Sequence, residues 1–108
     1  MFLENFSKKD FSALLNADFG DGNTLMHFAA AQGYGHVIAL LCGLGGDITR
    51  ANYRGDTPLH EAARNGHYEA VALLRHCMPF MYIKNSEGLT AAQLATQYGY
   101  NEIAVLLA

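Results

Sequence analysis

The stretch TPLHEAARNGH, residues 57–67, decides the fold of this chain. Thr57 has the hydroxyl of a helix N-cap, and Pro58 suits the first helical position, where its missing N–H does no harm. Gly66 is the residue type that commonly ends a helix. A second helix is expected over residues 68–76, because its apolar residues recur at helical spacing. Neither short helix is stable alone, so the sequence predicts two helices packed against each other.

The same pattern returns along the chain at a fixed step. Thr24, Thr57 and Thr90 stand 33 residues apart, and glycines and leucine pairs repeat in register with them. A period of this length predicts a stack of small similar units rather than a single globular core. Such a stack presents a long surface and seldom a catalytic pocket.

Residues 57–67 resemble the signature of the ankyrin repeat family. Residues 24–33 and 90–99 are weaker copies of that signature, and residues 45–49 are similar to the connector between repeats of the family. The resemblance covers the chain from about Phe19 to the C-terminus. It implies an all-α fold, an ankyrin-repeat solenoid of stacked helix–turn–helix units joined by short turn or hairpin connectors.

The resemblance also implies a structural role for two histidines. His27 and His60 occupy the histidine of the family motif, where the side chain bonds to the backbone of a neighbouring turn and locks consecutive repeats together. A catalytic base or a ligand is the alternative role. The third repeat has Gln93 at this position, which can still donate and accept hydrogen bonds but predicts a weaker lock.

The period divides the chain into four parts. We expect a degenerate N-terminal capping repeat over 1–18, repeats over 19–51 and 52–84, and a partial third repeat over 85–108. The apolar pair Leu106–Leu107 lies at the end of the sequence without a polar cap. This favours a piece cut from a longer protein over a last helix that a partner covers.

Composition excludes several kinds of partner. The net charge is −3, and seven basic residues scattered among ten acidic ones form no basic stripe for nucleic acid. No apolar run approaches the ~18 residues of a membrane span. Two cysteines are too few for a disulfide framework and favour a reducing compartment. We therefore expect a cytoplasmic protein; a nuclear one, or one delivered by a bacterium into host cytoplasm, remains open.

No motif in the chain predicts catalysis. Nucleophile elbows, phosphate loops and metalloprotease motifs are absent from the sequence, and the glycines at 43–46 follow a helix instead of opening one. His76-Cys77 lacks the paired spacing of a zinc site. The sequence therefore predicts no cofactor and a non-catalytic module that binds another protein. The alternatives are the targeting arm of a larger enzyme and a structural, self-associating module; we expect the isolated chain to be monomeric.

The partner is expected on the concave side, which in ankyrin repeat proteins is formed by the turn tips and the first helices. Tyrosine and arginine are enriched at binding hot spots, so the middle repeat is the best candidate. The candidate binding residues are Asp21, Asn23, Tyr53, Arg54, Asp56, Glu61, Arg64, Asn65, Glu87 and Tyr98.

A second candidate is the apolar stretch over 78–83, which stands where the polar connector of the family would be. Phe80 and Tyr82 could form an apolar docking patch. The alternative is that Met81 and Ile83 of this stretch simply pack between repeats.

Overall fold

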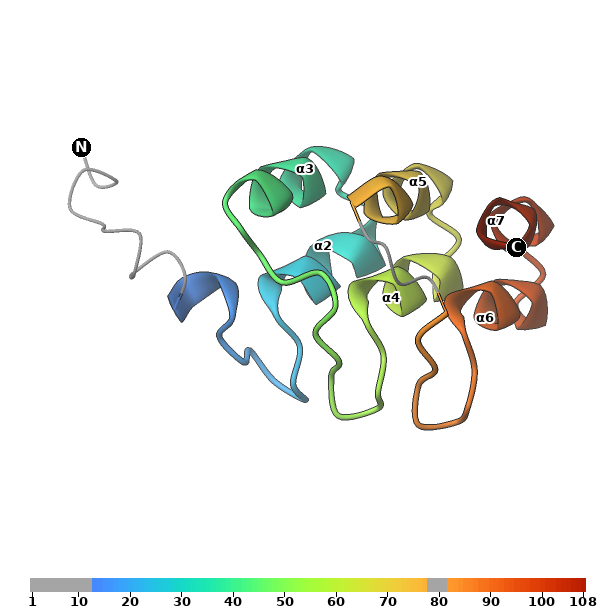
Figure 1. The fold of residues 1–108 in the computed structure, drawn as a ribbon, viewed down its shortest axis with the longest axis horizontal. Coiled ribbons are helices and arrows are strands. Elements are labelled where there is room, and N and C mark those ends of the chain that lie inside the picture. Colours follow the sequence, from blue (N-terminus) through green and yellow to red (C-terminus); the bar gives the residue numbers. More distant parts are fainter. Residues whose placement is uncertain (1–12, 78–81) are drawn as a thin grey trace.

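The computed structural model describes residues 13–77 and 82–108 (Figure 1). After a helical turn at 13–15, these ranges contain paired helices and no strand, which confirms the predicted all-α fold. The helices are α2 (Leu25–Gln32), α3 (Gly35–Gly43), α4 (Pro58–Arg64), α5 (Tyr68–Cys77), α6 (Ala91–Gln97) and α7 (Asn101–Leu107).

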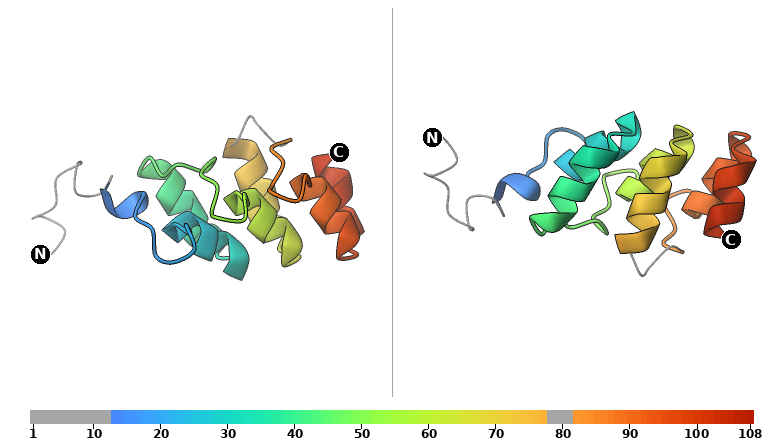
Figure 2. Two further views of the ribbon diagram at one scale, coloured as in Figure 1. Left: turned by 90° about the horizontal axis from the view of Figure 1, so that it is seen from below. Right: turned by 90° about the horizontal axis from the view of Figure 1, so that it is seen from above.

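The helices form two layers. The first helix of each pair packs on the first helix of the next, so that α2, α4 and α6 lie side by side, and α3, α5 and α7 form the second layer in the same way (Figures 1 and 2). The loops before α4 and α6 project from the first layer, on the side away from the second (Figure 1). The outer layer and the loop tips are therefore two separate faces of the stack.

Local chemistry fixes where the first helices begin. The Thr57 side chain accepts a hydrogen bond from the His60 amide, and the Thr90 side chain accepts one from the Gln93 amide. Both threonines satisfy one of the amides that a helix start leaves without a helical partner. Helix α4 ends at Arg64, two residues before Gly66, and α5 extends one residue past the expected end at residue 76.

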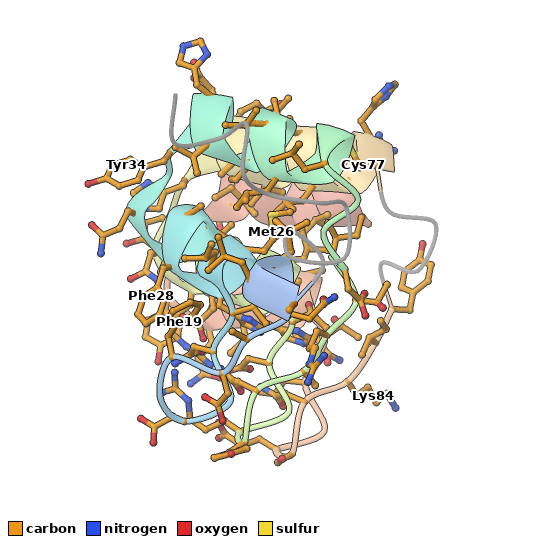
Figure 3. The ribbon with its side chains drawn as sticks, turned by 90° about the vertical axis from the view of Figure 1, so that its left-hand side faces the viewer. Phe19, Met26, Phe28, Tyr34, Cys77 and Lys84 are labelled. Carbon is orange, nitrogen blue, oxygen red and sulfur yellow. The ribbon has the colours of Figure 1, made fainter. Side chains whose placement is uncertain are left out.

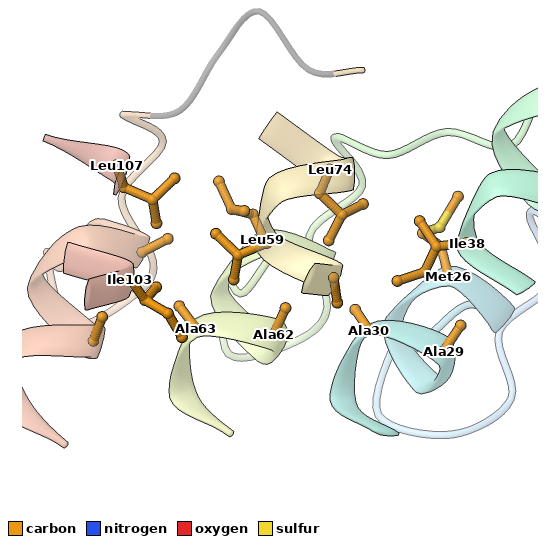
Figure 4. Close-up of a cluster of buried hydrophobic side chains, with 14 of the residues drawn as sticks. Met26, Ala29, Ala30, Ile38, Leu59, Ala62, Ala63, Leu74, Ile103 and Leu107 are labelled. Atoms are coloured by element: carbon orange, nitrogen blue, oxygen red, sulfur yellow. The ribbon is translucent and has the colours of Figure 1, made fainter. Parts of the chain in front are cut away.

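The core lies between the two layers (Figure 4). The first helices contribute adjacent alanines, such as Ala62 and Ala63, which are fully buried. Their small side chains let neighbouring helices approach closely, while the second helices fill the remaining space with larger residues such as Ile38 and Leu74. Each pair of helices thus buries its apolar faces only by stacking on its neighbours.

The last helix turns most of the apolar pair Leu106–Leu107 toward the core. Leu107 is only 1% exposed, and Leu106 packs against the core, so this pair does not form an exposed apolar end. Ile103 and Leu107 are four residues apart on one face of α7 and point into the core, which leaves Val105 on the outer face. At the other end Leu15 is buried, but most of the expected capping repeat over 1–18 lies outside the described residues. The division into repeats stays a prediction.

Two glycines that follow first helices allow the cost of backbone strain to be measured apart from the cost of crowding. Gly66 and Gly99 both have positive φ, +75° and +82°. A Cβ on Gly66 would lie 2.6 Å from the ring of Tyr100, whereas one on Gly99 would meet nothing within 4 Å. Gly99→Ala should therefore lower the free energy of unfolding by about 1 kcal/mol from backbone strain alone. Gly66→Ala should cost about 1 kcal/mol more, because the Tyr100 ring must move. Urea denaturation measures both, and equal losses would contradict the close contact.

Candidate functional site

The loops before the first helices close as small hairpins. In the middle loop, the Asn52 amide donates to the Asp56 carbonyl oxygen over 2.9 Å. The Asn52 side-chain oxygen accepts from the amides of Arg54 and Asp56 at 2.9 and 3.0 Å. The following loop repeats this arrangement around Asn85. An asparagine inside each loop therefore holds the tip in one shape.

Consecutive loops are also bonded to each other through their backbones. The Tyr53 amide donates to the Asp21 carbonyl oxygen over 2.9 Å, and the Ser86 amide donates to that of Arg54 over 3.0 Å. These bonds run from the tip of one repeat to the tip of the next. The tips therefore form a continuous ridge whose spacing is fixed by the backbone.

The same asparagines extend the connection through side chains. Asn52 Nδ2 donates to Asn23 Oδ1, and Asn85 Nδ2 donates to Asp56 Oδ1, each over 3.0 Å. Sequence reasoning missed Asn52 and Asn85. A signal was present, since these two asparagines are separated by the repeat step.

The first-helix histidines join each repeat to the next loop. His60 Nδ1 accepts from the Thr57 amide at 3.0 Å, while His60 Nε2 lies 2.9 Å from the Leu89 carbonyl oxygen. His27 makes the equivalent bonds, with its Nε2 2.8 Å from the Asp56 carbonyl oxygen. Because the carbonyl oxygens can only accept, each ring carries a proton on Nε2. Because Nδ1 accepts from an amide, it carries none, and both rings are neutral. The structural role expected for these histidines is confirmed.

His67 forms a further link that sequence reasoning missed. It follows the end of α4, and its Nε2 lies 2.9 Å from the carbonyl oxygen of Ala31 in α2. Its ring also covers Gly33, where an added Cβ would come within 2.6 Å of Nδ1. A glycine in one repeat and a ring from the next therefore pack at the end of the first-helix layer opposite the loops.

Four charged side chains form a cluster at the middle tip. Arg64 bridges Asp56 and Glu61, with a nitrogen 2.9 Å from a carboxylate oxygen of each. Arg54 adds a contact of 3.2 Å to the same Glu61 oxygen. Burial by itself raises the pKa of Asp56, but the hydrogen bond from Asn85 and the Arg64 guanidinium outweigh it, so this pKa lies below its ordinary value. The cluster carries no net charge.

The structure separates the candidate binding residues by exposure. Asp56 is fully buried and Glu61 is 7% exposed, so the expectation that both lie on the binding surface is wrong. Their carboxylates point inward because Arg64 and Asn85 are their partners. Asn23 and Arg64 are half-buried. The remaining candidates are exposed: Asp21, Tyr53, Arg54, Asn65, Glu87 and Tyr98.

Tyr53 is the most prominent aromatic residue at the tips, with 75% of its surface exposed. Its hydroxyl donates to Asp18 Oδ2 over 2.7 Å, and this hydrogen bond lowers the pKa of Asp18 and raises the pKa of Tyr53. Asp18 Oδ1 accepts from the amides of Gly20 and Gly22, so Asp18 also organises the first loop. The ring is thereby held over the preceding loop rather than swinging freely.

The structure describes only part of the apolar docking patch, and it offers no metal site in the residues that it describes. Tyr82 is 65% exposed, but Phe80 lies outside the described residues, so the apolar docking patch stays a prediction. Over 13–77 and 82–108 no group of three or more histidine, cysteine or acidic side chains could hold a metal ion. None of the helices in these ranges is long and apolar enough to cross a membrane.

The fold and the histidine links agree with a comparison of the sequence with known families. Residues 3–81 and 55–108 match the family model described as ankyrin repeats in three copies. The chain belongs to the ankyrin repeat family.

Several known proteins contain a region similar in sequence to this chain. The chain is 45% identical over 56 residues to an E3 ubiquitin-protein ligase of Arabidopsis thaliana. The aligned region covers 52% of the chain and 11% of the ligase. It is 41% identical over 83 residues to protein phosphatase 1 regulatory subunit 12A of Mus musculus, covering 75% of the chain and 8% of the subunit. A Rickettsia bellii protein named for its ankyrin repeats is 34% identical over 80 residues, 74% of the chain and 48% of that protein. The chain thus spans less than half the length of these relatives.

The buried histidines predict how stability depends on pH. Burial lowers the pKa of His27 and His60 below the ordinary value of 6.5, against the bonds to backbone carbonyls, which raise it. Protonation therefore favours the unfolded chain, and stability present above pH 6.5 is lost as the pH falls through that value. Below it the free energy of unfolding should fall by about 1 kcal/mol per pH unit for each histidine. In the double variant His27→Gln/His60→Gln this slope should flatten; an unchanged slope in chemical denaturation would contradict the assignment.

The charge cluster predicts unequal effects for two tip acids. Asp56→Ala takes from Asn85 its side-chain partner and leaves Arg64 paired with Glu61 alone, and should lower the free energy of unfolding by about 3 kcal/mol. Glu87→Ala removes an exposed carboxylate and should change it by less than about 0.5 kcal/mol. Urea denaturation of the two variants beside the parent chain tests this. Similar small effects would show that Asp56 does not support the tip.

Proposed function

We propose that this chain binds another protein through a tip surface formed by Asp21, Tyr53, Arg54 and Glu87, with Asn65 and Tyr98 on the adjoining first-helix side. One observation carries the proposal. Tyr53 is 75% exposed and the Arg54 side chain 64% exposed, although their backbones are bonded to neighbouring loops. Large side chains displayed on a fixed backbone are suited to recognition of a partner.

The bonds beneath the tips reduce what binding must cost. A partner that contacts Tyr53 meets a ring already tied to Asp18, and one that contacts Arg54 meets a guanidinium already oriented by Glu61. Little side-chain freedom is then lost on association, which favours affinity for a given contact area. Tyrosine and arginine also supply much of the binding energy in many interfaces.

The exposed charges favour a particular chemistry in the partner. Arg54 is already paired with Glu61 and contacts Asp56, whereas Asp21 and Glu87 stand exposed on the loops to either side. The tip row is therefore weakly acidic, in keeping with the net charge of −3. We propose a protein partner with an apolar or stacking group for Tyr53 and basic groups for the flanking acids.

We also propose that the chain itself is not catalytic. The family match accounts for residues 3–108, and it is a match to ankyrin repeats alone. The alternative of a targeting arm in a larger enzyme is favoured by one observation, the similarity to a ubiquitin ligase of which this chain would span 11%. Self-association through Leu106 and Leu107 is disfavoured by the burial of Leu107. We expect a monomer in a reducing compartment such as the cytoplasm, the nucleus or host cytoplasm.

A photo-reactive phenylalanine analogue at position 53 tests the proposed surface. The matched control carries the same analogue at position 40, because Leu40 is 61% exposed but lies in the outer layer, on α3. After irradiation in lysate, we expect position 53 to give discrete crosslinked protein bands and position 40 to give few or none. The crosslinks should weaken when Arg54 is also replaced by alanine.

Two results would contradict the proposal. Equal crosslinking from positions 40 and 53 would indicate nonspecific contact, and crosslinks confined to position 40 would place binding on the outer layer. Circular dichroism of each variant shows whether the fold is retained. Tyr53→Phe, which removes only the hydroxyl bonded to Asp18, should keep most of the binding if the ring surface is what the partner contacts.

A further inference from the structure

Two helices of the outer layer, α3 and α5, face each other along defined stripes. Gly35 and Ala39 of α3 and Glu69 and Leu73 of α5 line the groove between the two helices. A Cβ on Gly35 would lie 3.2 Å from Leu73 Cδ1, which confirms that these stripes are in contact. The C-terminal ends of the two helices lie next to each other (Figure 2).

A cysteine continues each stripe toward those ends. Cys42 follows Ala39 at helical spacing i, i+3, and Cys77 follows Leu73 at spacing i, i+4, so each lies on the face that meets the other helix. The two thiols are close enough to interact, since the neighbouring Cys77 thiol contributes to raising the pKa of Cys42. Cys77 is the last residue of α5 and lies on the side of the molecule away from the loops (Figure 3).

The two thiols differ in accessibility. Cys42 is half-buried, and burial together with the neighbouring Cys77 thiol raises the pKa of its own thiol to about 11. It is therefore protonated at neutral pH and does not react first, since the thiolate is the nucleophile. Cys77 is exposed and open to a reagent in solution. An accessible cysteine beside a sheltered one is the arrangement of an attacking and a resolving thiol.

We propose that Cys42 and Cys77 form a redox-active pair, which a low-molecular-weight disulfide such as oxidised glutathione converts into a disulfide bond between repeats. The Cys77 thiolate attacks one sulfur of oxidised glutathione, which forms a mixed disulfide and releases one glutathione thiolate. Cys42 then loses its proton and attacks the Cys77 sulfur. The Cys42–Cys77 bond forms, a second glutathione leaves, and the two electrons lost by the cysteines have reduced one glutathione disulfide to two thiols.

The position of the pair allows the bond to close. Both cysteines lie in the last turn of their helices, where carbonyl groups lack helical partners and the backbone yields most easily. The movement that brings the two sulfurs to bonding distance can be absorbed there. The closed bond joins the outer helices of two consecutive repeats and leaves the loop tips untouched, because tips and outer helices are on opposite sides (Figure 1).

The test is oxidation of the reduced, purified chain with excess oxidised glutathione, followed by acid quenching and intact mass measurement. We expect a monomer lighter by two hydrogen atoms, with no thiol left to alkylate and the bond located between Cys42 and Cys77 by peptide mapping. The crosslink restricts the unfolded chain, so the melting temperature should rise by about 10 °C or more. Dithiothreitol should restore the original mass and melting temperature.

Two variants serve as matched controls. Cys42→Ser should stop at a glutathione adduct on Cys77, and Cys77→Ser should react far more slowly, since only the sheltered thiol remains. Three results would overturn the proposal: a stable glutathione adduct on Cys77 of the parent chain with Cys42 still free, a covalent dimer through Cys77, or an internal disulfide that does not raise the melting temperature. Both variants should keep the helical circular dichroism of the parent chain.

Discussion

A neutral imidazole at the start of the first helix holds each of the first two repeats to the loop that follows. One nitrogen of His60 accepts the amide of Thr57, and the other donates to the carbonyl oxygen of Leu89; His27 does the same one repeat earlier. The ring therefore caps its own helix and fixes the next loop with the same side chain. Removing it would leave a buried amide without a partner and take one of two hydrogen bonds from a loop carbonyl oxygen, which costs free energy. The two loop-to-loop backbone bonds depend on the loop position that this ring sets.

The buried charges extend the same constraint toward the surface. Arg64 draws the carboxylates of Asp56 and Glu61 beneath the middle tip, and Asn85 of the next loop binds the other oxygen of Asp56. A loop supported in this way can display Tyr53 and Arg54 without any packing role for their outer surfaces. The residues that hold the loop are therefore different from the residues whose outer surfaces are exposed, which makes the tip surface suited to a binding function.

The sequence predicted the parts of the structure that depend on local pattern. The threonine caps, Pro58 and the repeated glycines gave the first helices to within a residue or two, and the repeat step gave the stacking. The histidine links came from the family resemblance. Asp56 was misplaced because its partners lie 8 and 29 residues further along the chain, which no local pattern reveals. The burial of Leu107 depends on how α7 is rotated against the core, which the leucine pair alone does not determine.

Hydrogen exchange at the Tyr53 and Ser86 amides tests most directly whether the loops are bonded into one ridge. Both side chains are exposed, yet each amide donates to the preceding loop. We expect these two amides to exchange at rates within about tenfold of the core helical amides of Ala63 and Leu74, because only opening of the stack releases them. Exchange at the rate of an unstructured peptide would show that the loops move independently, and would contradict a preformed binding surface.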